Sequence, residues 1–183
     1  MKKIPLTQGK FALVDDEDFE YLSQWKWYAK KTTNRRGFYA VRTDTSNGRK
    51  NTKAVVMHRF LMKETDPTIL IDHRDNDSLN NQKHNLRAAT YTENAQNRRS
   101  KVNSASKFLG VYKMISTGKS KRPDGSVFIK NYGQRWCGII MVNKKRIYSP
   151  RFPFTPCGEL AAAAFYDDKA KKYFGEFANL NFK

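Results

Sequence analysis

The sequence predicts an α+β protein built from two small domains. Short runs of β-branched and aromatic residues recur along the chain between turn-rich segments, and helical spacing is longest over residues 159–174. A stretch of small polar and basic residues at 101–107 has the composition of a linker. At 183 residues, each half is long enough to bury a modest core. We therefore expect domains over residues 1–100 and 108–183.

The first sixty residues predict several strands and two short helices. Residues 11–14 suit a strand, and the acidic residues that follow, Asp15 to Asp18, suit a helix start, where carboxylates meet the positive end of the helix dipole. Strands are expected at 38–42 and 54–57, with a short helix beginning at Met57. Three aromatic residues predict core packing more than base stacking: Trp25, Trp27 and Tyr28.

Residues 69–97 predict a strand, a loop, a second strand and a helix. The run at 68–71 ends at Asp72 and His73, and an Asp/Asn/Ser loop follows at 75–81. The chain returns through residues 86–89 into a helix at 92–99, for which Thr92 is the expected cap.

The last eighty residues predict three strands and a long helix. The strands are expected at 109–114, 135–142 and 146–149, with a long basic connection over 119–134 and a tight polar turn at 143–145. Within the helix, residues spaced by three and four define an expected apolar face: Leu160, Ala163, Ala164 and Phe174.

The formal net charge of +18 points to a polyanionic partner. Residues 1–100 hold 19 Lys+Arg against 12 Asp+Glu, and residues 101–183 hold 16 against 5, so the nets are +7 and +11. Both halves are basic, which a single charged tail would not produce. Cys137 and Cys157 lack the spacing of a zinc site or a disulfide framework. No signal peptide or membrane span is expected, so a soluble, intracellular protein is predicted.

Residues 69–97 resemble the ββα-metal finger of the HNH endonucleases, most closely phage and intron-encoded homing enzymes. The shared landmarks occur in order as a D-H pair, N-L-R, a Thr and E-N. The resemblance implies that Asp72 and Asn94 bind one divalent metal ion. Mg²⁺ is the expected ion, and Mn²⁺ is the alternative. It also implies that His73 is the general base and that Asn85 supports it by tying the loop. Arg74 to Asp77 stand where family members often have an Asn-Gly turn.

Residues 108–183 resemble the AP2 DNA-binding domain. The matching segments are Leu109-Gly110-Val111, Trp136 with Ile140, the alanine run 161–164 with Phe165-Tyr166-Asp167, and residues 174–182. In that family one face of a three-stranded sheet enters the major groove and a helix packs on the other face. The residues expected to contact DNA along the whole chain are Arg35, Arg36, Arg98, Arg99, Tyr112, Arg135, Lys144, Lys145 and Arg146.

Together these patterns predict a metal-dependent DNA endonuclease of homing type that nicks double-stranded DNA at a site selected by the AP2-like domain. We expect a monomer on DNA, no small-molecule cofactor and no membrane partner, in the cytoplasm of a bacterial host or a phage-infected cell. The alternative hypothesis is a non-catalytic DNA-binding regulator that retains an HNH fold. A third hypothesis is a basic RNA-associated protein.

Overall fold

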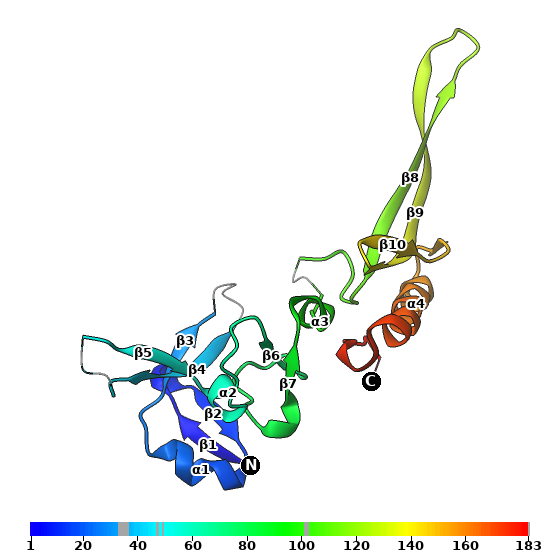
Figure 1. Cartoon of the computed structure of the whole chain (residues 1–183). Helices are drawn as coiled ribbons and strands as arrows, with labels where there is room; N and C mark the ends of the chain where they lie inside the picture. The colour runs from blue at the N-terminus through cyan, green and yellow to red at the C-terminus, as the bar shows by residue number, and fades with distance from the viewer. Residues whose placement is uncertain (33–36, 47, 49, 101–102, 183) are drawn as a thin grey trace. The chain divides into compact units, whose positions relative to one another are not determined.

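The computed structural model describes residues 1–32, 37–46, 48, 50–100 and 103–182. The chain divides into two compact units, unit 1 at Met1–Ala95 and unit 2 at Gln96–Lys183. Both units combine helices with small antiparallel sheets (Figure 1), so the predicted α+β class is confirmed.

In its described residues, unit 1 contains three small sheets and three short α-helices. β1 and β2 form a hairpin, β3, β4 and β5 form an antiparallel meander, and β6 pairs with β7. The strands are β1 (Lys2–Pro5), β2 (Phe11–Val14), β3 (Tyr28–Lys31), β4 (Phe38–Asp44), β5 (Lys53–Val56), β6 (Leu70–His73) and β7 (Leu86–Ala89). The helices are α1 (Asp16–Ser23), α2 (Met57–Leu61) and α3 (Tyr91–Gln96), with single 3₁₀ turns at Thr7–Gly9 and Lys83–Asn85.

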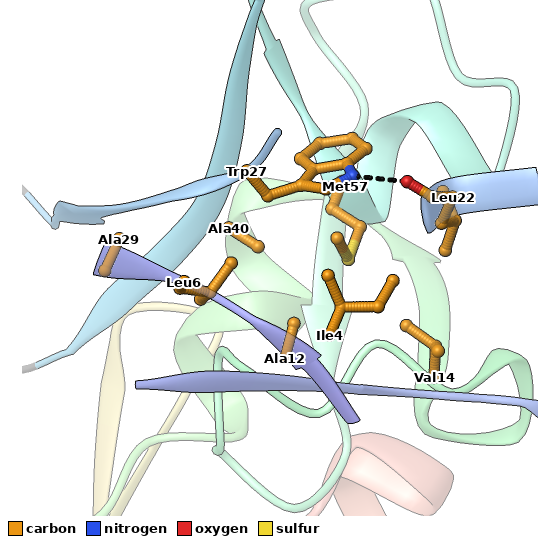
Figure 2. Close-up of a cluster of buried hydrophobic side chains, with 9 residues drawn as sticks. All are labelled: Ile4, Leu6, Ala12, Val14, Leu22, Trp27, Ala29, Ala40 and Met57. Carbon is orange, nitrogen blue, oxygen red and sulfur yellow. Dashed lines mark hydrogen bonds between the residues drawn. The ribbon is translucent and has the colours of Figure 1, made fainter. Parts of the chain in front are cut away.

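One apolar cluster joins the two hairpin strands, α1, α2 and the meander (Figure 2). Its members include Ile4 and Val14 from the hairpin, Leu22 from α1 and Met57 from α2. Trp27 is buried in the cluster and donates its indole N–H to the Leu22 carbonyl at 2.8 Å. The core assignment of Trp27 is therefore confirmed.

The acidic residues do begin a helix, as predicted, because Asp16, Glu17 and Asp18 occupy the first turn of α1. Asp15 occupies the N-cap position of α1, yet its carboxylate binds residues 82 and 83 instead of the helix N-terminus. It accepts hydrogen bonds from the Lys83 N–H at 2.8 Å and from Gln82 Nε2 at 3.0 Å. The ammonium of Lys83 also pairs with Glu17 and Asp18, at 2.7 and 3.0 Å.

The helix after β7 begins earlier than the sequence predicted. α3 is capped by Thr90, whose Oγ1 accepts a hydrogen bond from the Glu93 N–H at 3.3 Å. The Glu93 carboxylate accepts in return from the Thr90 N–H at 2.7 Å. This reciprocal pair is a capping box, so the prediction of Thr92 as the cap was wrong. The T-x-x-E spacing from Thr90 to Glu93 was the signal that identifies it.

Unit 2 is a sheet with β9 (Val127–Val142) at its centre. β8 (Val111–Lys121) pairs along one edge of β9, whereas β10 (Lys145–Tyr148) and the short β11 (Phe152–Pro153) pair along the other. A tight turn at Asn143 and Lys144, both with positive φ, joins β9 to β10, as predicted.

α4 (Pro156–Phe174) covers one face of this sheet. Thr155 caps it by accepting from the Gly158 N–H at 3.2 Å, and a 3₁₀ turn follows at Gly175–Phe177. The buried residues of α4 are Gly158, Ala162, Ala163, Tyr166, Asp167 and Ala170. Of the predicted apolar face, Ala163 is buried and Phe174 packs against the core, whereas Leu160 and Ala164 are exposed. The sheet instead covers small residues that let α4 approach closely.

The C-terminal segment is tied to the start of the sheet by hydrogen bonds between the buried Asp167, Asn181 and the backbone of Leu109. Asp167 accepts hydrogen bonds from the Asn181 N–H at 2.9 Å and from Asn181 Nδ2 at 3.0 Å. The Asn181 side chain also exchanges two bonds with the backbone of Leu109, at 2.7 and 3.0 Å. These contacts explain why a polar Asn and Asp recur among the otherwise apolar residues of this region.

The long basic connection predicted over residues 119–134 is an extended hairpin instead. β8 continues to Lys121 and β9 begins at Val127, so most of the predicted loop is paired strand. The register shifts between Ile115 and Thr117, beside Gly133 with φ +90. Beyond this bulge the two strands extend alone, past β10 and α4 (Figure 1).

Ser106, in the segment predicted to be a linker, packs within unit 2. Its side chain is buried and donates to Glu159 Oε1 at 2.7 Å.

Across the described residues, no helix combines the length and apolar character needed to cross a membrane.

Candidate active site

Asp72 lies near the end of β6 in a buried ion pair with Arg87 of β7. The two residues face each other in the strand register, and Asp72 Oδ2 accepts from Arg87 Nε at 2.8 Å and from Nη2 at 2.7 Å. Both side chains are only 7% exposed. The predicted metal ligand thus shares its carboxylate with Arg87, a residue to which the sequence motif assigns no role. The antiparallel pairing of Asp72 with Arg87 is the signal that would have found it.

His73, the last residue of β6, packs in a cluster of three rings. Its imidazole meets that of His58 from α2 edge to face, with ring centroids 5.2 Å apart. Tyr39 from β4 stacks on His73 at 6.4 Å and contacts His58 at 4.9 Å. No candidate partner for His58 lies near it in sequence, and the fold supplies His73, which is fifteen positions away.

Burial sets the protonation of both imidazoles. It lowers the pKa of His73, against the opposing effects of a hydrogen bond with Asn81 and the carboxylates of Asp75 and Asp72. Burial also lowers the pKa of His58 to about 3, with the neighbouring His73 and Arg59 adding to the effect. At neutral pH both rings are therefore neutral, the state in which an imidazole can accept a proton.

Asn85 locks the loop that follows His73. Its Nδ2 donates to Asp75 Oδ1 and to the Asn80 carbonyl, both at 2.9 Å, and its Oδ1 accepts from the Asp75 N–H at 3.0 Å. The Asn85 carbonyl accepts from the Arg74 N–H at 2.9 Å. The buried Asn85 is thus placed to fix the loop and, through it, the backbone on which His73 lies.

The same loop is clamped to the rest of unit 1. Leu13 of β2 donates its N–H to the Leu79 carbonyl at 2.9 Å and accepts from the Asn81 N–H at 2.8 Å. Ser78 donates to the Phe38 carbonyl at 2.9 Å, and Asp15 holds the Lys83 backbone as described above. Asp75 gains several hydrogen bonds, from Asp77, Asn80 and Asn85, which lower its pKa although burial opposes them. The loop is therefore held by contacts on both sides.

Asn94 projects from α3, one turn after the Thr90 cap, and its side chain is exposed. Its oxygen and those of Asp72 are hard donors, the chemistry that Mg²⁺ and Mn²⁺ prefer. Within the described part of the chain, no group of three or more His, Cys, Asp or Glu residues is arranged to hold a metal ion. Asp72 is buried and Asn94 is exposed, so the two predicted ligands differ in their access to solvent.

The strand register shows which face of the sheet in unit 2 carries each predicted DNA-contacting residue. Val111, Trp136 and Ile140 face α4, so residues one position away along each strand face the opposite side. That open face carries Tyr112, Arg135 and Arg146. Lys144 lies in the β9–β10 turn, and Lys145 opposes Val142, whose side chain packs towards α4.

Two of the remaining predicted contacts, Arg98 and Arg99, lie outside helices and strands. Arg98 and Arg99 are exposed at the start of unit 2, where the Arg98 carbonyl accepts from Asn179 Nδ2 at 2.9 Å. Arg35 and Arg36 lie outside the residues that the structure describes.

Comparisons with protein-family models, curated proteins and solved structures find no match to this chain. Functional inference therefore depends on the residues and their geometry.

Proposed function

We propose that the chain is a metal-dependent endonuclease of the HNH type that hydrolyses phosphodiester bonds in double-stranded DNA. The observation that carries the proposal is a buried His73 beside Asp72 at the end of β6, followed by a loop that Asn85 locks. The elements around it, β6, β7 and α3, occur in the order of a ββα finger. The HNH and AP2-like assignments of the two units belong to this proposal.

His73 acts as the general base. Its neutral imidazole takes the proton of the attacking water, a contribution that is typically about 10²- to 10⁴-fold in rate. Tyr39 and His58 pack against the ring and restrict its orientation. Asn85 is a positioning residue, because its hydrogen bonds reach the loop and not the imidazole.

Asp72 and Asn94 are the residues that would hold the metal, and their oxygen atoms fit Mg²⁺ or Mn²⁺. When bound, such an ion offsets charge on the scissile phosphate and on the departing 3′ oxygen. Arg87 fixes the Asp72 carboxylate through two N–H groups on Oδ2.

Unit 2 supplies affinity for DNA. Its net charge of +11 over residues 101–183 favours a polyanion, and the open sheet face presents Arg135 and Arg146 as phosphate ligands and Tyr112 as an apolar contact. A single site in unit 1 and binding as a monomer predict that one strand is nicked.

A specific observation favours the second candidate, a DNA-binding regulator without catalysis. The buried Asp72–Arg87 pair is charge-neutral, and such a pair can serve folding alone. Cleavage assays separate the two functions.

The test is conversion of supercoiled plasmid by the wild-type protein and by His73→Ala, each with Mg²⁺, Mn²⁺ or chelator, alongside a gel-shift assay. We expect the wild type to nick only with metal, and the variant to bind DNA but cut at least 100-fold more slowly, the low end of the range for a positioned base. His84→Ala is the matched control, because His84 is exposed and lies in the neighbouring 3₁₀ turn. A wild type that binds DNA yet leaves plasmid intact with either metal would support the regulator.

A further inference from the structure

The outer part of the β8–β9 hairpin, residues 117–131, is a two-stranded ribbon, referred to below as the outer ribbon. Its pairs run from Thr117 opposite Asn131 to Lys121 opposite Val127. β10 and β11 pair with β9 only from Arg135 onwards, so the outer ribbon projects beyond the sheet (Figure 1). Isolated two-stranded ribbons are only marginally stable in water, so contacts with a partner would stabilise a ribbon that projects beyond its sheet.

One face of the outer ribbon combines cations with exposed aliphatic side chains. Lys119 opposes Ile129 and Lys121 opposes Val127, and alternation along the strands places all four on the same face. Ile129 is 71% exposed and Val127 is 56% exposed. β-branched residues at such exposure, next to lysines, form a surface suited to a partner with both charged and apolar parts.

The charge of the outer ribbon identifies that partner. It contains Lys119, Lys121, Arg122 and Lys130 against a single acidic residue, Asp124. Asp124 is occupied locally, since its Oδ1 accepts from the Ser126 N–H at 2.8 Å in the hairpin turn. Arg122 lies over the ring of Phe128 at 5.1 Å, which holds its guanidinium at the tip. The excess of cations over acidic residues therefore favours a polyanion as the partner.

We infer that the outer ribbon binds double-stranded DNA through the face that carries Lys119 and Lys121. Lys119 and Lys121 contact phosphates, and Val127 and Ile129 contact the sugars and base edges of a groove, which is wide enough to admit a two-stranded ribbon. This inference rests on the proposed action on DNA but assigns a binding surface that the nuclease site does not require.

The ribbon's length sets the stretch of DNA that it adds. Five residues of β8, 117–121, span roughly 16 Å at about 3.3 Å per residue. That distance corresponds to about five base pairs at about 3.4 Å each.

The first experiment measures binding of the full chain to a 40-base-pair duplex of random sequence across a salt series, without metal. Lys119→Gln/Lys121→Gln should reduce the magnitude of the log–log salt slope by about 1.8, which is about 0.9 for each lost phosphate contact. Lys171→Gln/Lys172→Gln is the matched control, because it removes the same charge from exposed positions in the last turn of α4. Equal slopes for the two variants would overturn the inference, since the effect would then be one of net charge.

A second variant removes the outer ribbon. Thr117 and Asn131 face each other, so residues 118–130 can be replaced by an Asn-Gly turn while the buried residues of the sheet remain. The shortest duplex that gives full affinity should then decrease by about five base pairs. An unchanged minimum length, or a change in oligomeric state with unchanged DNA binding, contradicts the inference.

These measurements read binding and are independent of cleavage. A wild type that binds through the outer ribbon yet never cuts would remove the proposed nuclease activity and leave this inference standing. A wild type with no affinity for duplex DNA would remove both.

Discussion

Arg87 is the residue on which the candidate site depends most, because its guanidinium compensates a carboxylate that is almost fully buried. Arg87→Met removes that compensation and leaves the Asp72 charge in the protein interior. We expect a loss of about 3–5 kcal/mol in the free energy of unfolding, measured by urea denaturation. Lys26→Met, at an exposed position of the same unit, should change it by no more than about 0.5 kcal/mol. A loss below about 1 kcal/mol in Arg87→Met would show that the pair is not structural.

Because of His58, the free energy of unfolding should depend on pH below pH 7. The unfolded chain takes up a proton on this side chain near pH 6.5, whereas in the folded protein its pKa is about 3. The unfolded state therefore binds more protons between these values, and stability falls as the pH decreases through this window. From pH 7 to pH 5 the loss from His58 is roughly 2 kcal/mol.

Denaturation at pH 7, 6 and 5 measures this effect. His58→Gln lacks the titrating group, so its stability should fall by roughly 2 kcal/mol less than that of the wild type over the same range. Parallel pH profiles for the two proteins would be inconsistent with a buried, neutral His58.

At the scale of elements, variants of Thr90 and Thr92 test which of the two threonines caps α3, the helix that carries Asn94. Thr90→Ala breaks the capping box with Glu93 and should destabilise unit 1 by about 1 kcal/mol in thermal or urea unfolding. Thr92→Ala changes an exposed residue inside the helix and should have an effect within about 0.5 kcal/mol. The opposite order of effects would restore Thr92 as the cap.

Elements specified by local signals were predictable from the sequence. The acidic start of α1, the strands around Asp72 and the turn at Asn143 all follow from residues close together in the chain. The extended β8–β9 pairing was not, because its polar, glycine-containing strands lack an apolar alternation. The buried stripe of α4 was also missed, since alanines at 161–164 give little periodic contrast and the sheet determines which of them are covered.

At the scale of the whole molecule, the candidate site shows the same limit. The sequence singled out Asp72, His73 and Asn85, which β6 and its loop bring into one region. It did not identify Arg87, His58 or Tyr39 as their partners. Those contacts depend on how β7, α2 and β4 pack around β6, and no local spacing encodes such packing. Charge, by contrast, was readable from composition, because both halves of the chain are basic.

The measurement that tests the central claim most directly is a time course of supercoiled plasmid incubated with the wild-type protein and Mg²⁺, with a chelator control. One site in each chain predicts that open circles form first and that linear DNA follows only later, with no product in chelator. Supercoiled plasmid that stays intact with Mg²⁺ and with Mn²⁺, while a gel shift shows it bound, would contradict the account and identify a protein that binds DNA without cutting it.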